Sequence, residues 1–294
     1  MANALKLASG GILGADPSDL DQTLSSSFDL AMSYPQWQGS GRARHLPQGA
    51  QTAASVCSRF APLAQISDAG AGETVGGINH WTAIVDQFRQ AQEILARERP
   101  RRILTAGGDC ACDVAVIDYL HGLYSDLTVI WVDAHFDANT QTSTPSGNFH
   151  GMPVAAIMGH APNEMQALLK YPLPPSQFRY FTVHIGDDGD KAFSLKNALR
   201  WWDPSSENFS GPIHIHFDLD ALIPAEFPHV AYPDGNLGTS AGLDIVGKLA
   251  RDGDVVGLTI TEFAPVDTEA AVEGGRYIAE LCEVALHSRV SRGS

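Results

Sequence analysis

Three residues of metal-binding type stand at every second position of one short segment: Asp133, His135 and Asp137. In an extended backbone, side chains at this spacing project to the same side. Two carboxylates and an imidazole placed in this way could hold a divalent cation. The pattern alone fits a polar strand end or a turn equally well, so the metal interpretation needs a second group of ligands.

A second group is found at Asp218 and Asp220, which alternate with the apolar Phe217 and Leu219. An isolated pair would suit a helix N-cap or a turn, but two adjacent carboxylates repel each other unless a cation or a proton separates them. Both groups together offer four carboxylates and one imidazole, an oxygen-rich set that favours Mn²⁺ over structural zinc. Four anions exceed the charge of one divalent ion, which predicts two ions with a hydroxide nucleophile between them.

Short apolar runs that alternate with helical stretches would position these residues. A helix is predicted at 80–97, before Pro100, and residues 15–46 are predicted as a surface excursion with neither strand nor helix. The predicted strands are 102–107, 128–134, 179–186, 213–220 and 255–263. This order predicts an α/β protein with a mostly parallel sheet between two helical layers, a three-layer α/β/α fold. Because no repeat or linker divides the chain, residues 1–294 are predicted to form a single domain.

The chemically active residues all lie at the C-terminal ends of the predicted strands. In chain order these are Asp109 and Cys110, then Asp133 to Asp137, then Asp218 and Asp220, and finally Glu262. Ligands of open α/β sheets bind at this edge. The sequence therefore predicts a single site.

Composition narrows the class of partner. The chain has 34 acidic and 19 basic residues, a formal charge of -15, which argues against nucleic acid and favours a small cationic substrate. No apolar run approaches the roughly 18 residues of a membrane span. The four cysteines are too scattered for a disulfide framework, so we expect a cytoplasmic protein with no membrane partner.

Taken in chain order, three motifs resemble the fingerprints of the arginase and agmatinase family, the ureohydrolases. The motifs are Gly107-Gly108-Asp109-Cys110, Asp133-Ala134-His135-Phe136-Asp137 and Asp218-Leu219-Asp220. The resemblance implies a hydrolase of linear amidines, an amidinohydrolase that cleaves a guanidino group to urea or hydroxyurea and an amine. It also suggests a homo-oligomer, either a trimer or a hexamer.

The resemblance further assigns the ligands of two divalent ions, with Mn²⁺ as the first candidate. Asp133 and Asp218 would bridge the ions. Cys110 and Asp137 would complete one ion, and His135 and Asp220 would complete the other.

A later block, Asn139-Thr140 followed by Ser146-Gly147-Asn148-Phe149-His150-Gly151, resembles the arginase branch of the family. The likeness implies that Asn139, Ser146 and Asn148 hold the α-carboxylate of an arginine-like substrate. His150 is implied as the proton shuttle to the leaving amine, a role suited to a group that titrates near pH 7. The alternative for His150 is a cap on a helix that begins near Met152.

Two acidic positions are implied to hold the rest of the substrate. Glu262 matches the family residue that pairs with the guanidinium group, and an exposed strand-end glutamate is the alternative. One of Asp187, Asp188 and Asp190 would bind the α-amino group, with Asp190 as our choice.

Cys110 departs from the family pattern, which has histidine at this position. A thiolate is soft and negatively charged, so the bound water would have a higher pKa or the site would prefer Fe²⁺, Co²⁺ or Zn²⁺. A cysteine here is also similar to relatives that act on Nω-hydroxyarginine, which leaves arginine, Nω-hydroxyarginine and other guanidino acids as candidate substrates. The alternative is a buried, apolar Cys110 in a site with one metal or none, as in a non-catalytic binding relative.

A zinc deacetylase of the related superfold is a third interpretation. Such an enzyme would use a single metal and a histidine pair beside the site. No such pair is evident, although strand alternation would place His214 and His216 on the same side as Asp218.

Overall fold

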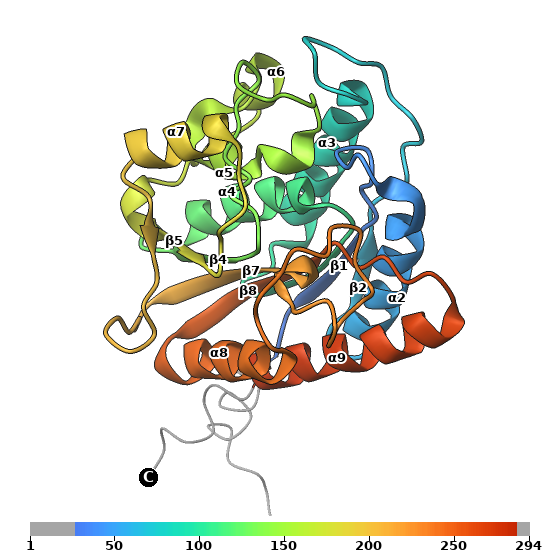
Figure 1. Cartoon of the computed structure of the whole chain (residues 1–294), viewed down its shortest axis with the longest axis vertical. Helices are drawn as coiled ribbons and strands as arrows, with labels where there is room; N and C mark the ends of the chain where they lie inside the picture. The colour runs from blue at the N-terminus through green and yellow to red at the C-terminus, as the bar shows by residue number, and fades with distance from the viewer. Residues whose placement is uncertain (1–26, 287–294) are drawn as a thin grey trace, which may run out of the picture.

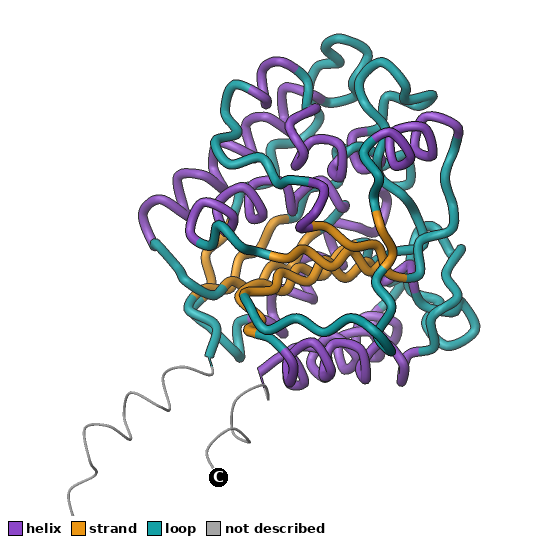
Figure 2. Tube along the Cα trace, turned by 90° about the vertical axis from the view of Figure 1, so that its left-hand side faces the viewer, coloured by secondary structure: helices purple, strands orange, loops and turns teal. Residues whose placement is uncertain are grey.

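The computed structural model describes residues 27–286. In this part of the chain eight strands form one sheet in the order β2-β1-β3-β8-β7-β4-β5-β6. Each pair of neighbouring strands is parallel. Helices cover both faces of the sheet (Figures 1 and 2). The predicted three-layer α/β/α fold is thereby confirmed.

Most strands are short and most of the covering helices are longer. The strands are β1 Leu30–Tyr34, β2 Leu63–Gln65, β3 Ile103–Gly107, β4 Thr128–Val132, β5 Phe178–Phe181, β6 Arg200–Trp201, β7 Pro212–Asp218 and β8 Asp254–Thr261. The helices are α2 Leu46–Cys57, α3 Trp81–Glu98, α4 Asp113–Leu123, α5 Pro153–Ala155, α6 Asn163–Gln166, α7 Asp188–Lys196, α8 Thr239–Asp252 and α9 Thr268–Leu286. Within residues 27–286, no helix combines the length and the apolar character needed to cross a bilayer.

An apolar core lies on each face of the sheet, and successive side chains of β7 point alternately into one core or the other. Ile213, Ile215 and Phe217 belong to the core that includes side chains of α2, α8 and α9. The intervening His214 and His216 point to the other face, where they contact the first residue of α4. In Figure 1, α8 and α9 lie below the sheet, and α3 and α4 lie above it. Polar side chains of β7 are therefore buried on the α4 side.

The predicted elements are present, with changed ends. The helix at 80–97 corresponds to α3, and the five predicted strands correspond to β3, β4, β5, β7 and β8. The strand β3 ends at Gly107 as predicted, whereas β4, β5, β7 and β8 end earlier than predicted because the backbone turns where polar residues begin. Thr182 after β5 and Glu262 after β8 have φ of 67° and 59°, values that interrupt an extended strand.

The prediction that residues 15–46 contain neither strand nor helix is wrong for the described part of that segment. Residues 30–34 form β1, which is buried between β2 and β3, and Leu46 begins α2. A stretch of only three apolar residues, Leu30 to Met32, is too short to stand out from its polar surroundings. Residues 15–26 lie outside the described residues. The short β2 and β6 were also not predicted.

Candidate metal centre

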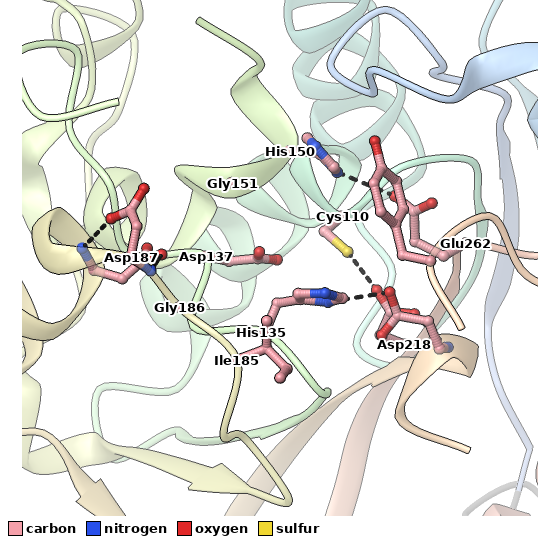
Figure 3. A pocket seen from close by; sticks show the side chains of 13 residues that line it. Cys110, His135, Asp137, His150, Gly151, Ile185, Gly186, Asp187, Asp218 and Glu262 are labelled. Atoms are coloured by element: carbon pink, nitrogen blue, oxygen red, sulfur yellow. Dashed lines mark hydrogen bonds and ion pairs between the residues drawn. The ribbon is translucent and has the colours of Figure 1, made fainter. Parts of the chain in front are cut away.

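Four adjacent strands deliver polar side chains to one end of the sheet. β3, β8, β7 and β4 are neighbours in the sheet, and all of them are parallel, so their C-terminal ends meet at the same edge. A cavity of about 290 Å³ opens there (Figure 3). Its lining residues are Cys110, His135, Asp137, His150, Gly151, Ile185, Gly186, Asp187, Asp190, Asp218, Asp220, Tyr232 and Glu262.

The turn after β3 is built to hold Cys110 in place. A side chain on Gly108 would overlap the carbonyl oxygen of Gln36, so only glycine allows this close approach. The buried Asp109 carboxylate accepts hydrogen bonds from Gln36 Nε2 at 3.0 Å, Gly39 N at 2.8 Å and Ala111 N at 3.0 Å. Asp109 therefore fixes the turn rather than facing the cavity.

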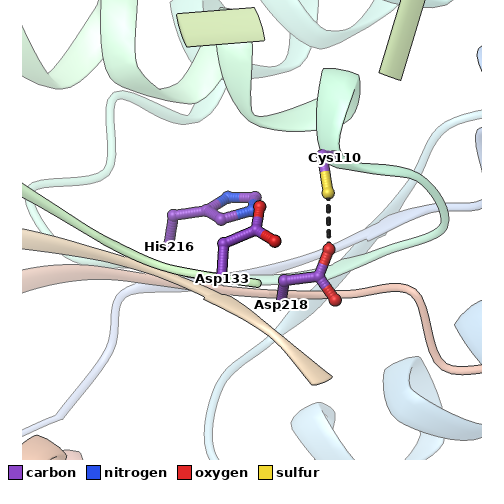
Figure 4. A group of neighbouring side chains, drawn as sticks. All are labelled: Cys110, Asp133, His216 and Asp218. Carbon is purple, nitrogen blue, oxygen red and sulfur yellow. Dashed lines mark hydrogen bonds between the residues drawn. The ribbon is translucent and has the colours of Figure 1, made fainter. Parts of the chain in front are cut away.

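One group of possible metal ligands consists of Cys110, Asp133, His216 and Asp218. Each residue offers one ligand atom, and these atoms all lie within 4.8 Å of one another (Figure 4). All four residues are buried. The Cys110 thiol donates to Asp218 Oδ2 at 2.8 Å.

A second group consists of Asp133, His135 and Asp220, whose ligand atoms also lie within 4.8 Å of one another. His135 Nδ1 is 3.1 Å from Asp220 Oδ2 and 3.4 Å from Asp133 Oδ1. Asp133 belongs to both groups. The geometry thus provides two neighbouring ion positions that share one carboxylate.

Turns, and not extended strands, bring these side chains together. β4 ends at Val132, Asp133 Oδ1 accepts the His135 backbone N–H at 2.7 Å, and Asp137 has φ of 51°. The expected extended backbone over 133–137 is therefore wrong. Likewise β7 ends at Asp218, whose side chain accepts the N–H of Asp220 at 2.7 Å in a 3₁₀ turn.

The acidic groups of the site are crowded in the absence of a cation. Burial, and after it the neighbouring carboxylates, raise the pKa of Asp137 and Asp218 well above the usual range. Burial is also the main cause that raises the pKa of Asp220 to about 7 and that of Glu262 to about 8. Among the described residues, one oxygen of Asp137, one of Asp220 and both of Glu262 have no hydrogen-bond partner. Such a cluster of buried acids fits bound cations.

A buried hydrogen-bond network lies behind the first group of ligands. His214 Nε2 and His216 Nδ1 donate to the same oxygen of Asp113, at 2.8 and 2.9 Å, and Thr259 Oγ1 donates to the other at 2.6 Å. Burial alone would raise the pKa of Asp113, but the two histidines hold it below the usual range. Asp113 is consequently an ionised acceptor inside the protein.

The sequence reasoning did not assign His216 or Asp113 to the site. Alternation along the predicted strand does place His216 on the same face of the sheet as Asp218, and the structure shows it there. Asp113 opens α4 and meets β7 only through the tertiary fold, so no local pattern could have indicated it.

His150 and Glu262 face each other on one wall of the cavity (Figure 3). His150 Nδ1 is 3.5 Å from Glu262 Oε1, and its ring lies 5.3 Å from that of Tyr232. Burial lowers the pKa of His150. The helix near this point begins at Pro153 and has no side-chain cap, so His150 is not a helix cap. The exposed fraction of Glu262 is 1%, so it is not an exposed strand-end glutamate.

Of the residues predicted to bind the α-carboxylate and α-amino groups of the substrate, only Asp190 is among the residues that line the cavity. It also accepts the N–H groups of Ala138 and Asp187 at 2.9 and 3.1 Å. Asn139 is buried and donates to Asp187 Oδ2, which belongs to another lining residue, at 3.0 Å.

Ser146 and Asn148 are not among the residues that line the cavity as described. Ser146 is exposed, and Asn148 Oδ1 accepts from Asn79 Nδ2 at 2.9 Å. Their role in binding stays a prediction.

Several known proteins resemble the chain in sequence. Residues 43–286 match the model of the arginase family. The arginase of Saccharomyces cerevisiae is 32% identical over 189 residues, which cover 55% of this chain and 56% of the yeast protein. A Staphylococcus aureus arginase is 29% identical over 173 residues, 52% of this chain and 57% of that protein. These matches span about half the length of the curated relatives.

Solved structures show the same fold. The Entamoeba histolytica arginase in complex with L-ornithine aligns with a TM-score of 0.76 and 17% identity, covering 90% of this chain and 99% of that chain. The Bacillus caldovelox arginase aligns with a TM-score of 0.74 and 20% identity over 90% of this chain and 99% of that chain. At these identities the likeness concerns the fold.

Proposed function

Because the chain belongs to the arginase family, we propose that it is a metal-dependent amidinohydrolase that acts on an arginine-like amino acid. One observation carries the proposal. Two ligand groups that share Asp133 lie in the same cavity as Glu262, a buried carboxyl with two unpartnered oxygens. This combination suits a cationic guanidino group held beside a pair of metal ions.

The residues present fit two divalent ions. Cys110, Asp133, His135, Asp137, Asp218 and Asp220 would hold them, and the buried, unpartnered oxygens of Asp137 and Asp220 support this assignment. Such ions lower the pKa of water and so supply a nucleophile near neutral pH. Mn²⁺ is the family expectation, and the Cys110 thiol favours Fe²⁺, Co²⁺ or Zn²⁺.

Glu262 and His150 would act on the guanidinium group itself. Neither Glu262 oxygen has a hydrogen-bond partner among the described residues, although Oε1 lies 3.5 Å from His150 Nδ1. The carboxylate could therefore accept a bidentate, charge-assisted pair of hydrogen bonds, which would fix the guanidinium carbon in the cavity. His150 lies 3.5 Å from Glu262, within reach of the nitrogen that leaves. It would carry a proton to that nitrogen.

The other end of the substrate would lie toward Asp187, on the opposite side of the cavity from Glu262 (Figure 3), and toward Asp190, which also lines the cavity. Asp190 would meet the α-amino group, and Asn139, Ser146 and Asn148 would hold the α-carboxylate. A negatively charged thiolate at Cys110 would weaken the ions as Lewis acids, which would favour Nω-hydroxyarginine, a less basic guanidino compound, over arginine. We also propose a single cytoplasmic domain that assembles as a trimer or hexamer.

A urea-release assay tests the proposal. Metal-free protein is supplied with Mn²⁺, Fe²⁺, Co²⁺ or Zn²⁺ and offered arginine, Nω-hydroxyarginine, agmatine and guanidinobutyrate, with bound metal measured in the same sample. We expect turnover of arginine or Nω-hydroxyarginine and little of agmatine, which lacks the carboxylate. The Asp133→Asn variant controls for a contaminating host enzyme. No turnover of any guanidino compound by protein with two bound ions would favour the non-catalytic binding relative.

A further inference from the structure

We propose that His216 is a metal ligand, and that its Nε2 atom binds one ion together with the sulfur of Cys110 and oxygens of Asp133 and Asp218. The inference rests on the proposed metal centre. It adds a ligand that the motifs of the family resemblance do not contain, because there the ion at Cys110 is completed by Asp137.

The positions of the donor atoms support this ligand. Ligand atoms of Cys110, Asp133, His216 and Asp218 lie within 4.8 Å of one another, and Asp137 is not part of this group. Figure 4 shows the imidazole and the two carboxylates rising from the sheet, with the thiol above them. The relative exposure of the four side chains is 2% or less. An ion between them would be enclosed by sulfur, nitrogen and oxygen donors.

The surroundings of His216 orient its ring toward that position. Its Nδ1 is hydrogen-bonded to Asp113 Oδ2 at 2.9 Å, so Nε2 is the ring nitrogen that is left to bind a cation. The indole of Trp131 stacks on the imidazole with centroids 3.5 Å apart and planes 3° apart. A carboxylate that fixes the tautomer and plane of an imidazole in this way is the usual support of a metal-binding histidine.

The Nε2 atom has no short hydrogen bond to another group of the described chain. The nearest hydrogen-bonding group given to it by the structure is Thr261 Oγ1, at 3.4 Å. The same hydroxyl lies 3.6 Å from Cys110 Sγ. A buried acceptor with one long contact, beside a thiol and two carboxylates, is therefore placed to bind a cation.

The chemistry of the set explains why such a ligand belongs with Cys110. At position 110 the family pattern has an imidazole ligand, and this chain has a thiolate. His216, on β7, would supply an imidazole ligand to the same ion without adding negative charge. Even without Asp137, the thiolate, the imidazole and the two carboxylates form a four-donor set, which suits Zn²⁺ or Co²⁺ better than Mn²⁺.

His214 provides a matched control on the same strand. It donates to the same oxygen of Asp113 at 2.8 Å and is equally buried. Its other ring nitrogen, Nδ1, faces the backbone of Gly257 and has no hydrogen-bond partner in the described chain. A purely structural role would make His214 and His216 equivalent, whereas a ligand role separates them.

The test reconstitutes metal-free protein with Co²⁺ and measures bound cobalt and the visible spectrum. We expect two ions per chain in the wild type and in His214→Gln. In His216→Gln we expect one ion to bind more weakly by more than the roughly 10- to 100-fold that the loss of an outer-shell partner costs, with a changed ligand-field spectrum. A His216→Gln protein that binds both ions with wild-type affinity and spectrum would overturn the proposal.

A measurement on the wild type keeps the test valid if the variants fold poorly. In the Co²⁺ protein, the Nδ1 proton of a bound His216 should give a strongly shifted NMR signal that exchanges slowly with D₂O, because Asp113 and the core bury it. The absence of such a signal in protein with two bound ions would overturn the proposal. Neither readout uses a substrate, so protein that shows the signal but releases no urea would contradict the proposed function alone.

Discussion

Replacing Glu262 by Gln tests whether the metal-free site contains a buried, unpartnered carboxyl. Burial, and after it the charge of Asp133, raise the pKa of Glu262 from 4.5 to about 8. The folded protein therefore keeps this proton to a higher pH than the unfolded chain does. The free energy of unfolding of the wild type should therefore fall progressively as the pH rises from 4.5 to about 8. The Glu262→Gln variant has no carboxyl at this position and should not show this fall.

The size of the effect follows from the two pKa values. For a group that moves from 4.5 to about 8, linkage gives a cost on the order of 2 kcal/mol at pH 6 and 4 to 5 kcal/mol at pH 8.5. The Gln amide has nearly the same shape and does not ionise, but its unpaired polar atoms cost about 1 to 3 kcal/mol at either pH. The stability difference between variant and wild type should thus grow by roughly 2 to 3 kcal/mol from pH 6 to pH 8.5 in favour of the variant.

Urea unfolding of both proteins in the presence of a chelator measures this difference. Glu93, an exposed residue of α3, gives the matched control, and Glu93→Gln should show no growing difference with pH. With ions and substrate present, Glu262→Gln should instead lose about 100-fold in kcat/KM, because a charge-assisted pair of hydrogen bonds is lost. A stability difference that does not change with pH would refute the assignment of a buried ionisable Glu262, and unchanged kcat/KM would refute its pairing with the guanidinium.

Three further substitutions test other parts of the site. His150→Asn should lower kcat about 100-fold without reducing bound metal, and should remove the limb of the pH profile due to this group; an unchanged kcat would exclude the proton shuttle. Cys110→His should move metal content toward Mn²⁺ by elemental analysis, and the reasoning fails if metal content and pH profile both equal those of the wild type. Asp133→Asn should weaken both ions because Asp133 belongs to both ligand groups, so full retention of either ion would contradict the shared position.

The fold could be predicted from the sequence because its signals are local. Apolar runs of strand length, such as the one that forms β4, alternate with helical stretches, and parallel pairing follows from that alternation. β1 was missed because its five residues follow a long polar segment and carry only three clearly apolar side chains. Its place beside β3 depends on packing in the assembled sheet.

The ligands could be predicted only in part. Motifs and strand ends brought Asp133, His135 and Asp218 to one edge, but the side chains converge through turns with positive φ, as at Asp137 and Glu262. Non-glycine residues adopt such angles only where the surrounding structure enforces them. The orientation of His216 likewise depends on Asp113, 103 positions away in the chain.

Returning metal to the metal-free protein while following urea release tests the central claim most directly. We predict that release from arginine or Nω-hydroxyarginine rises with added ion and levels off at two equivalents per chain, because the two ligand groups share Asp133 and act as one centre. Full activity at one equivalent, or binding of two equivalents without any urea release, would contradict a binuclear amidinohydrolase.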